Sequence, residues 1–175
     1  MTVVHNQSGF SLIELLVVVA LFAIISIAAV SLFLSTLRGS NVTNASAVIK
    51  QTGNYALDVM SYMVRDAQQI TGCDSVAGTL TLLNRDGGTT QFFINNTNQI
   101  ASNSAAASIT TNNVRVNPSD SDLAGTLPAF VTCSPAVNPT TVTIRFVIRK
   151  GTKGVDNDTD IVTQTFGTTV GLRRY

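Results

Sequence analysis

The sequence predicts an α+β fold, in which a long, protruding N-terminal helix packs by its second half on an antiparallel β-sheet domain. Three observations support this prediction. Residues 15–34 form an apolar run without a charge, residues 42–70 carry apolar side chains at steps of three and four, and segments beyond residue 78 alternate with a period of two. The first two patterns are typical of helices and the third is typical of strands.

The expected helix extends from about Phe10 to about Ile70. Its first half is apolar on all sides between Leu15 and Leu34, and a helix of about 20 residues spans ~30 Å, the thickness of the hydrocarbon core of a bilayer. Its second half is apolar on one face only, which supplies the stripe that a sheet must cover. Gly72 follows at a position suited to a left-handed helix cap.

Two hairpins are expected in the sheet domain. The segments GTLTLL and TTQFFIN flank the turn sequence NRDGG, and Asp-Gly between alternating apolar residues is a strong hairpin signal. Residues 141–149 (TVTIRFVIR) also alternate, and residues 161–172 return after a turn rich in Asp and Gly. VRVNP and LPAFVTC are candidate short strands.

Composition excludes several classes of function. The chain has 11 basic and 10 acidic residues and a net charge of +1, so no basic patch is expected and no nucleic-acid partner is predicted. Its single histidine is His5, which removes Ser-His-Asp and Cys-His catalysis from the folded part of the chain, together with His-ligated metal sites. We therefore predict that the protein is not an enzyme.

The two cysteines, Cys73 and Cys133, both follow the apolar run and lie too far apart in sequence to resemble a metal site. If this part of the chain is extracytoplasmic, a disulfide is the natural interpretation. It would close a loop of about 60 residues, which contributes roughly 4 kcal/mol in the chain-entropy model. The alternative is a pair of buried free thiols.

The stretch GFSLIELLVVVALFAII, which begins at Gly9, admits three interpretations. A secretory signal peptide needs a basic region and a short apolar core, but no Lys or Arg precedes this run and the run is too long. An ordinary single-span anchor fits the length but leaves Glu14 unexplained, because a carboxylate within a span costs about 3 kcal/mol on insertion scales. The third interpretation is a resemblance: the stretch is similar to the N-terminal signature of type IV prepilins and type II secretion pseudopilins.

The resemblance implies a route of processing and assembly. In that family a prepilin peptidase cuts after the glycine, here Gly9, and the new first residue, here Phe10, is N-methylated. The glutamate, here Glu14, then pairs with the amino terminus of a neighbouring subunit. The implied partners are other pilin or pseudopilin subunits, the prepilin peptidase, an inner-membrane assembly platform and the membrane itself. The physics agrees, because a carboxylate in hydrocarbon is costly unless it finds a partner charge.

The resemblance also implies a division of the chain. Its expected parts are a leader peptide (1–9), a transmembrane and filament-core part of the helix (10–38), an amphipathic part of the helix packed on the sheet (39–72) and the sheet domain (73–175). The leader lacks the Lys or Arg usual in the family, and Arg38 and Lys50 favour the opposite orientation. Orientation therefore rests on the resemblance and on the cysteines.

The sequence DNDTD suggests calcium as the one candidate cofactor. Asp156, Asp158 and Asp160 alternate, and alternating acids can place several oxygens around one hard cation. The loop is not an EF-hand, because Ile161 stands where that motif has glycine and Gly167 where it has glutamate. A solvated hairpin turn is the alternative, since Asp and Asn are favoured in turns.

The leading prediction is a structural subunit of a type IV pilus-like filament or of a type II secretion pseudopilus. Such a subunit would be held in the inner membrane before assembly and then lie in an extracytoplasmic or cell-surface filament, as a fimbrium subunit does. The low charge and the Thr- and Asn-rich domain favour a minor pilin or a pseudopilin. The alternative is a single-pass, membrane-anchored ligand-binding module that does not polymerise. Trimming by a prepilin peptidase would separate the two.

Overall fold

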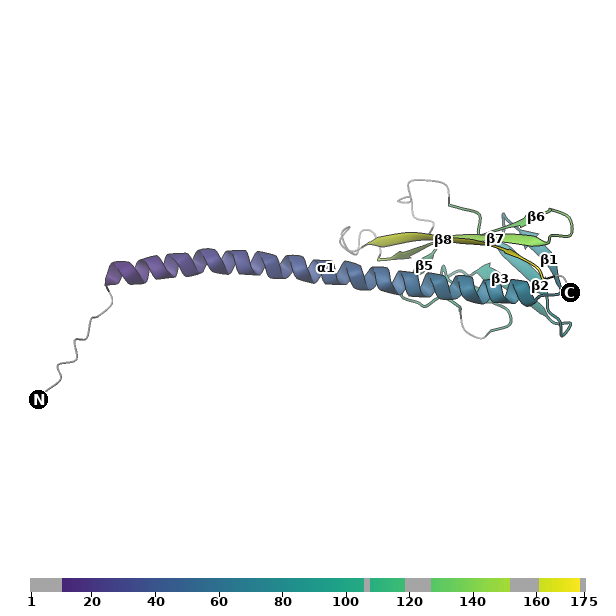
Figure 1. Cartoon of the computed structure of the whole chain (residues 1–175), viewed down its shortest axis with the longest axis horizontal. Coiled ribbons are helices and arrows are strands. Elements are labelled where there is room, and N and C mark those ends of the chain that lie inside the picture. The colour runs from purple at the N-terminus through teal and green to yellow at the C-terminus, as the bar shows by residue number, and fades with distance from the viewer. Residues whose placement is uncertain (1–10, 106–107, 119–126, 152–160, 174–175) are drawn as a thin grey trace, which may run out of the picture. The chain divides into compact units, whose positions relative to one another are not determined.

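A computed structural model describes residues 11–105, 108–118, 127–151 and 161–173. In this part of the chain one long helix is followed by eight strands (Figure 1). They are α1 (Leu12–Asp66), β1 (Gln69–Asp74), β2 (Thr79–Leu83), β3 (Thr89–Ile94), β4 (Ile100–Ser102), β5 (Arg115–Val116), β6 (Val131–Ser134), β7 (Thr141–Lys150) and β8 (Val162–Gly171). All strand pairs are antiparallel. The predicted α+β fold class is thereby confirmed.

The chain divides into two compact units, Met1–Asn41 and Val42–Tyr175. The described part of the first unit is helical throughout from Leu12, and its side chains from Ser11 to Asn41 are all exposed. The second unit holds the rest of α1 and all eight strands. The predicted boundaries at residues 9, 38 and 72 are not tested by this division and remain predictions.

The second unit contains two four-stranded sheets. In the first, the strands follow one another in the order β1-β2-β3-β4. In the second, β7 is the central strand and pairs with β5, β6 and β8. Strands β7 and β8 are each ten residues long and pair over their full length. They are therefore the longest strand pair of this sheet.

Both predicted hairpins are present. In the first, Leu83 of β2 pairs with Thr89 of β3, and Asn84 N–H donates to the Gly88 carbonyl at 2.8 Å. Gly87 lies within this turn at a φ of 82°, a conformation that costs a glycine little. In the second, β7 pairs with β8 in an unbroken register. The candidate strands VRVNP and LPAFVTC contain β5 and β6.

The predicted end of the helix was wrong. Helix α1 ends at Asp66, not at about Ile70, and the following residues form β1. Ile70 is buried, as its place in the apolar pattern predicts, but it is buried by pairing with Leu82. Gly72 is a strand residue opposite Thr81, not a left-handed cap. A free edge of β2 supplied hydrogen-bond partners that the local pattern does not reveal, so tertiary pairing overrode the helical periodicity.

A different residue caps the helix. The Nε–H of Arg85 donates to the Asp66 carbonyl at 3.2 Å, and the same nitrogen lies 3.5 Å from Asp66 Oδ1. A cation at a helix C-terminus satisfies an orphan carbonyl and interacts favourably with the helix dipole. The cap comes from the β2–β3 turn, so the residue that binds the last carbonyl is distant from α1 in sequence.

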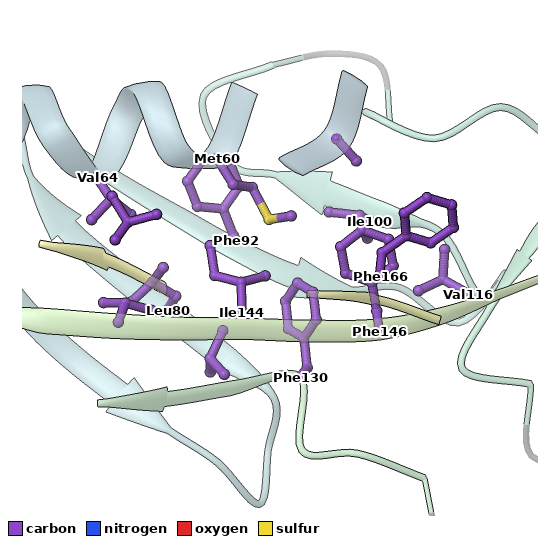
Figure 2. Close-up of a cluster of buried hydrophobic side chains, with 14 of the residues drawn as sticks. Met60, Val64, Leu80, Phe92, Ile100, Val116, Phe130, Ile144, Phe146 and Phe166 are labelled. Atoms are coloured by element: carbon purple, nitrogen blue, oxygen red, sulfur yellow. The ribbon is translucent and has the colours of Figure 1, made fainter. Parts of the chain in front are cut away.

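The core of the second unit forms where the apolar stripe of α1 meets the strands. Ile49, Met60 and Val64 are fully buried, and burial of each such side chain contributes about 1.5–3 kcal/mol. Figure 2 shows Met60 and Val64 pointing from the helix toward buried side chains of the strands, including Phe92 and Leu80. The predicted stripe is therefore used as expected for most of its length.

A close approach between helix and sheet occurs at Gly53. A Cβ atom at this position would overlap the ring of Phe166, which comes from β8. The ring of Phe166 in turn stacks on Phe146 of β7, with centroids 5.6 Å apart. Glycine at position 53 weakens the helix by up to ~1 kcal/mol relative to alanine, and the space it leaves is filled by an aromatic ring.

Cys73 of β1 and Cys133 of β6 form a disulfide, with Cα atoms 6.3 Å apart. The two strands belong to different sheets. The bond therefore ties the edge of one sheet to the edge of the other across a sequence separation of 60 residues. No cysteine remains free, so the alternative of two buried thiols does not describe this structure.

We predict that Gly53→Ala destabilises the second unit by about 1–3 kcal/mol, because overpacking against Phe166 outweighs the helix propensity gained. Chemical denaturation of the full chain in detergent, followed by near-ultraviolet circular dichroism, measures the loss. Gly39→Ala is the matched control, since a Cβ there meets nothing within 4 Å, and it should not lower stability. A Gly53→Ala protein as stable as the parent would contradict the close packing.

Replacing both cysteines by alanine should lower the free energy of unfolding by about 4 kcal/mol, because the unfolded chain regains the entropy of a loop of some 60 residues. The midpoint of denaturant unfolding, measured for the oxidised parent, the reduced parent and the double variant, checks this. Reduction should reproduce the effect of the substitutions. If the oxidised parent and the double variant unfold together, the bond between the sheets contributes nothing.

Candidate functional site

The apolar part of α1 is the largest surface in the described chain without a partner. Every large apolar side chain from Leu12 to Leu37 is exposed, with Leu12 at 80% and Ile27 at 72%. A helix that is apolar on all sides is stable only inside a membrane or among other helices. Surfaces of this kind mark sites of contact with lipid or protein.

Three of the hydroxyl groups in this segment are paired within the helix. Ser26 donates to the Phe22 carbonyl at 2.7 Å, Ser31 to the Ala28 carbonyl at 2.9 Å and Thr36 to the Leu32 carbonyl at 2.9 Å. Each hydroxyl proton is thereby satisfied within the helix itself, as is common for Ser and Thr in apolar helices. The segment can therefore enter an apolar environment without burying these donors unpaired.

By length and composition α1 is able to cross a membrane, and its most apolar window has no buried residue in the structure. About 20 residues suffice to span the hydrocarbon core, and the run from Leu15 to Leu34 provides them. The apolar helix is consistent with membrane anchoring.

Glu14 is the one charged residue between Ser11 and Leu37, and it lies in the first turn of α1. The Ser11 carbonyl accepts from the backbone N–H groups of Glu14 at 3.0 Å and of Leu15 at 3.2 Å, which starts the helix. A carboxylate in the first turn is stabilised by the helix dipole by about 0.3–1 kcal/mol.

The sequence interpretation missed a signal for the start of the helix at this position. Ser11-Leu-Ile-Glu14 has the spacing of a capping box, Ser/Thr-x-x-Glu, which is a sequence-level signal of a helix start. Helix α1 begins at Leu12, immediately after Ser11. The helix was predicted to start at about Phe10. The Ser-x-x-Glu pattern could have located its start two residues later.

The remaining predicted site residues divide into two groups. Cys73 and Cys133 are brought together in the disulfide described above. The cleavage and methylation residues Gly9 and Phe10 lie outside the described residues, as do the three acids Asp156, Asp158 and Asp160. Their predicted roles stay predictions. Within the described ranges no group of three or more His, Cys, Asp or Glu side chains could hold a metal ion.

An open groove of about 590 Å³ lies at the C-terminal end of α1. Its polar lining side chains are Gln68, Gln69, Arg85, Asn138, Thr140 and Arg173, with Ala67, Pro139 and Leu172 completing it. No carboxylate, thiol or imidazole lines this groove. It therefore has hydrogen-bond donors for a polar ligand but lacks a pair of acid and base side chains.

One comparison with known proteins bears on this site. Residues 4–30 match the family model described as the prokaryotic N-terminal methylation motif. No curated protein and no solved structure matches the chain. The match covers Glu14, the start of α1 and much of the exposed apolar run. Residues 4–30 thus carry the N-terminal signature of type IV prepilins and pseudopilins, a structural class of protein.

Proposed function

We propose that this protein is a subunit of a type IV pilus-like filament or of a type II secretion pseudopilus. It is made as a precursor in the inner membrane, cut by a prepilin peptidase after Gly9 and N-methylated on Phe10. The apolar half of α1 then moves from lipid into the core of a filament. The observation that carries the proposal is a fully exposed apolar helix that begins within the methylation motif and bears Glu14 as its one charge.

The free energy of burying these side chains excludes water as the lasting environment of this segment. Each large apolar side chain that leaves water contributes about 1.5–3 kcal/mol, so a run of such residues cannot remain in water. Lipid satisfies this requirement before assembly and neighbouring helices satisfy it afterwards, because lipid tails and leucine side chains are equally apolar. The same surface therefore suits both a membrane-held precursor and a filament core.

Glu14 favours an assembling subunit over a simple anchor. The helix dipole returns about 0.3–1 kcal/mol, whereas a carboxylate costs up to about 3 kcal/mol at the centre of a span and less toward its end, where Glu14 lies. If the helix enters apolar surroundings beyond Glu14 as well, the dipole alone does not offset that cost. Cleavage after Gly9 would create an ammonium group, and pairing with it on a neighbouring subunit would compensate the charge. The pair would also favour one stagger between adjacent helices.

The disulfide supports an extracytoplasmic second unit. Structural disulfides form and persist in oxidising compartments such as the periplasm or the cell surface. The Cys73–Cys133 bond joins two sheets of the same unit, as expected of a structural bond. This supports a cytoplasmic leader and an external sheet domain, an orientation that Arg38 and Lys50 alone do not favour.

The second candidate function is a membrane-anchored ligand-binding module that does not polymerise. The open groove at the end of α1, with two arginines and three amides, favours it. It shares the apolar helix with the leading proposal but does not require the leader to be removed or Glu14 to be paired.

Glu14→Gln and Glu14→Ala should each be cleaved normally yet enter filaments about tenfold less or worse, because a tenfold change corresponds to only ~1.4 kcal/mol of the lost pairing. Immunoblots of sheared filaments against membranes, with the mass of the mature N-terminus, measure both steps. Asp58→Asn, an exposed acid elsewhere on α1, is the control and should assemble as the parent does. Normal assembly of Glu14→Gln would rule out the charge pair.

Gly9→Leu should leave the precursor uncut, since the peptidase recognises the small residue before the cleaved bond. Intact mass spectrometry of membrane-extracted protein should show retention of the nine-residue leader and no N-methyl group. Gly39→Leu, which also replaces an exposed glycine that has open space around it, should be processed normally. If the parent chain itself keeps its leader in cells that contain a prepilin peptidase, the ligand-binding module replaces the filament subunit.

A further inference from the structure

Four segments that are distant in sequence form the groove at the end of α1. They are the junction of α1 and β1, the β2–β3 turn, the β6–β7 loop and the residues that follow β8. All four belong to the second unit. The volume of about 590 Å³ lies within the range of ~300–1,000 Å³ that is usual for ligand sites. The groove is therefore of the size that holds a ligand.

The groove is positively charged. Arg85 and Arg173 line it, and both are exposed. A smaller cavity of about 150 Å³ shares Arg173 with the groove and is also lined by Tyr62, Arg65 and Asp66. The linings of the two cavities thus contain three arginines and one aspartate, a net charge of +2. Charge complementarity favours a ligand with more than one negative charge.

The uncharged part of the lining suits a peptide. Gln68, Gln69 and Asn138 contribute side-chain amides. Each amide has both a donor and an acceptor, as the peptide group itself has, and Pro139 and Leu172 add apolar surface beside them. Arginine binds a carboxylate through two parallel hydrogen bonds. The lining as a whole therefore matches a peptide that carries acidic side chains.

A second groove, of about 400 Å³, follows strand β1. It is lined by residues 69–73 and by residues 136–139 of the β6–β7 loop. Gln69, Asn138 and Pro139 line both grooves. In the described part of the chain β1 pairs with β2 alone, and extended peptides bind at such strand edges through main-chain hydrogen bonds. The second groove therefore favours an extended chain over a compact anion.

A nucleic acid is the less suitable polyanion. Its affinity for a protein depends on many phosphate contacts, whereas the cavities at the end of α1 present three arginines. Single strands bind where their bases stack on aromatic side chains. Among the described residues, no aromatic side chain lines either of the two grooves.

We propose that the groove at the end of α1 binds an extended, acidic peptide segment of a partner protein. Arg85 and Arg173 bind its carboxylates, and the amides of Gln68, Gln69 and Asn138 bind its main chain. Neither the apolar half of α1 nor Glu14 takes part. The site is therefore compatible with a filament subunit and with an anchored binding module alike.

Fluorescence anisotropy of a short, labelled peptide with alternating Glu and Ser tests the site on the full chain in detergent. Binding should be saturable and should weaken as salt is added, because exposed charges are screened. The same peptide with Gln in place of Glu should bind at least about tenfold more weakly, since it lacks the charge-assisted hydrogen bonds. The measurement requires neither cleavage nor filaments, so its failure would leave the proposed function standing.

Two variants locate the site. Arg173→Gln removes one guanidinium group and Asn138→Asp adds a carboxylate to the lining, so each should weaken binding by about tenfold. Asn138 has a φ of 52°, which aspartate also tolerates. The matched controls lie outside the groove and should bind as the parent does: Arg145→Gln, at an exposed arginine of β7, and Asn98→Asp, at an asparagine with a φ of 55°.

Near-ultraviolet circular dichroism establishes that each variant is folded. No saturable binding of the Glu peptide, equal binding of the Gln peptide, or an equal loss in Arg145→Gln and Arg173→Gln would each overturn the proposal. A thymidine oligonucleotide that displaces the peptide and binds more tightly would also overturn it, because the groove would then be a nucleic-acid site.

Discussion

The second unit depends on the burial of one helical stripe between two sheets that share no strand. Ile49, Met60 and Val64 of α1 contact the same core as Leu80 and Phe92 of one sheet and residues of the other. Gly53 lets the ring of Phe166 approach the helix backbone. Without this stripe, each sheet would expose its apolar face. The disulfide between β1 and β6 is the second connection between the sheets.

The same helix satisfies a different physical requirement in its first half. There the apolar residues surround the axis, and nothing in the described chain covers them. The hydroxyls of Ser26, Ser31 and Thr36 are satisfied by the helix's own carbonyls, so an apolar solvent does not meet these three donors unpaired. Glu14 is the exception, and a charge that lipid cannot compensate requires a partner of opposite charge. Glu14, in the first turn of this helix, is thus the one feature of the segment that an apolar environment alone does not satisfy.

The apolar half of α1 offers a surface that is not directional, because contacts between apolar side chains fix no single register. Such a surface suits lipid and neighbouring helices alike, since lipid tails and leucine side chains are equally apolar.

The sequence by itself determined the elements, because their signals are local: apolar periodicity, the Asp-Gly turn at Gly87 and the methylation motif. The charge-free run and Glu14 also identified the candidate site. Tertiary structure decided where α1 ends, since pairing of Ile70 with Leu82 and the cap from Arg85 come from residues distant in sequence. It also brought Cys73 to Cys133 and left β8 at an edge. Neither result can be derived from periodicity, because a strand pattern states which face is buried but not which strand lies beside it.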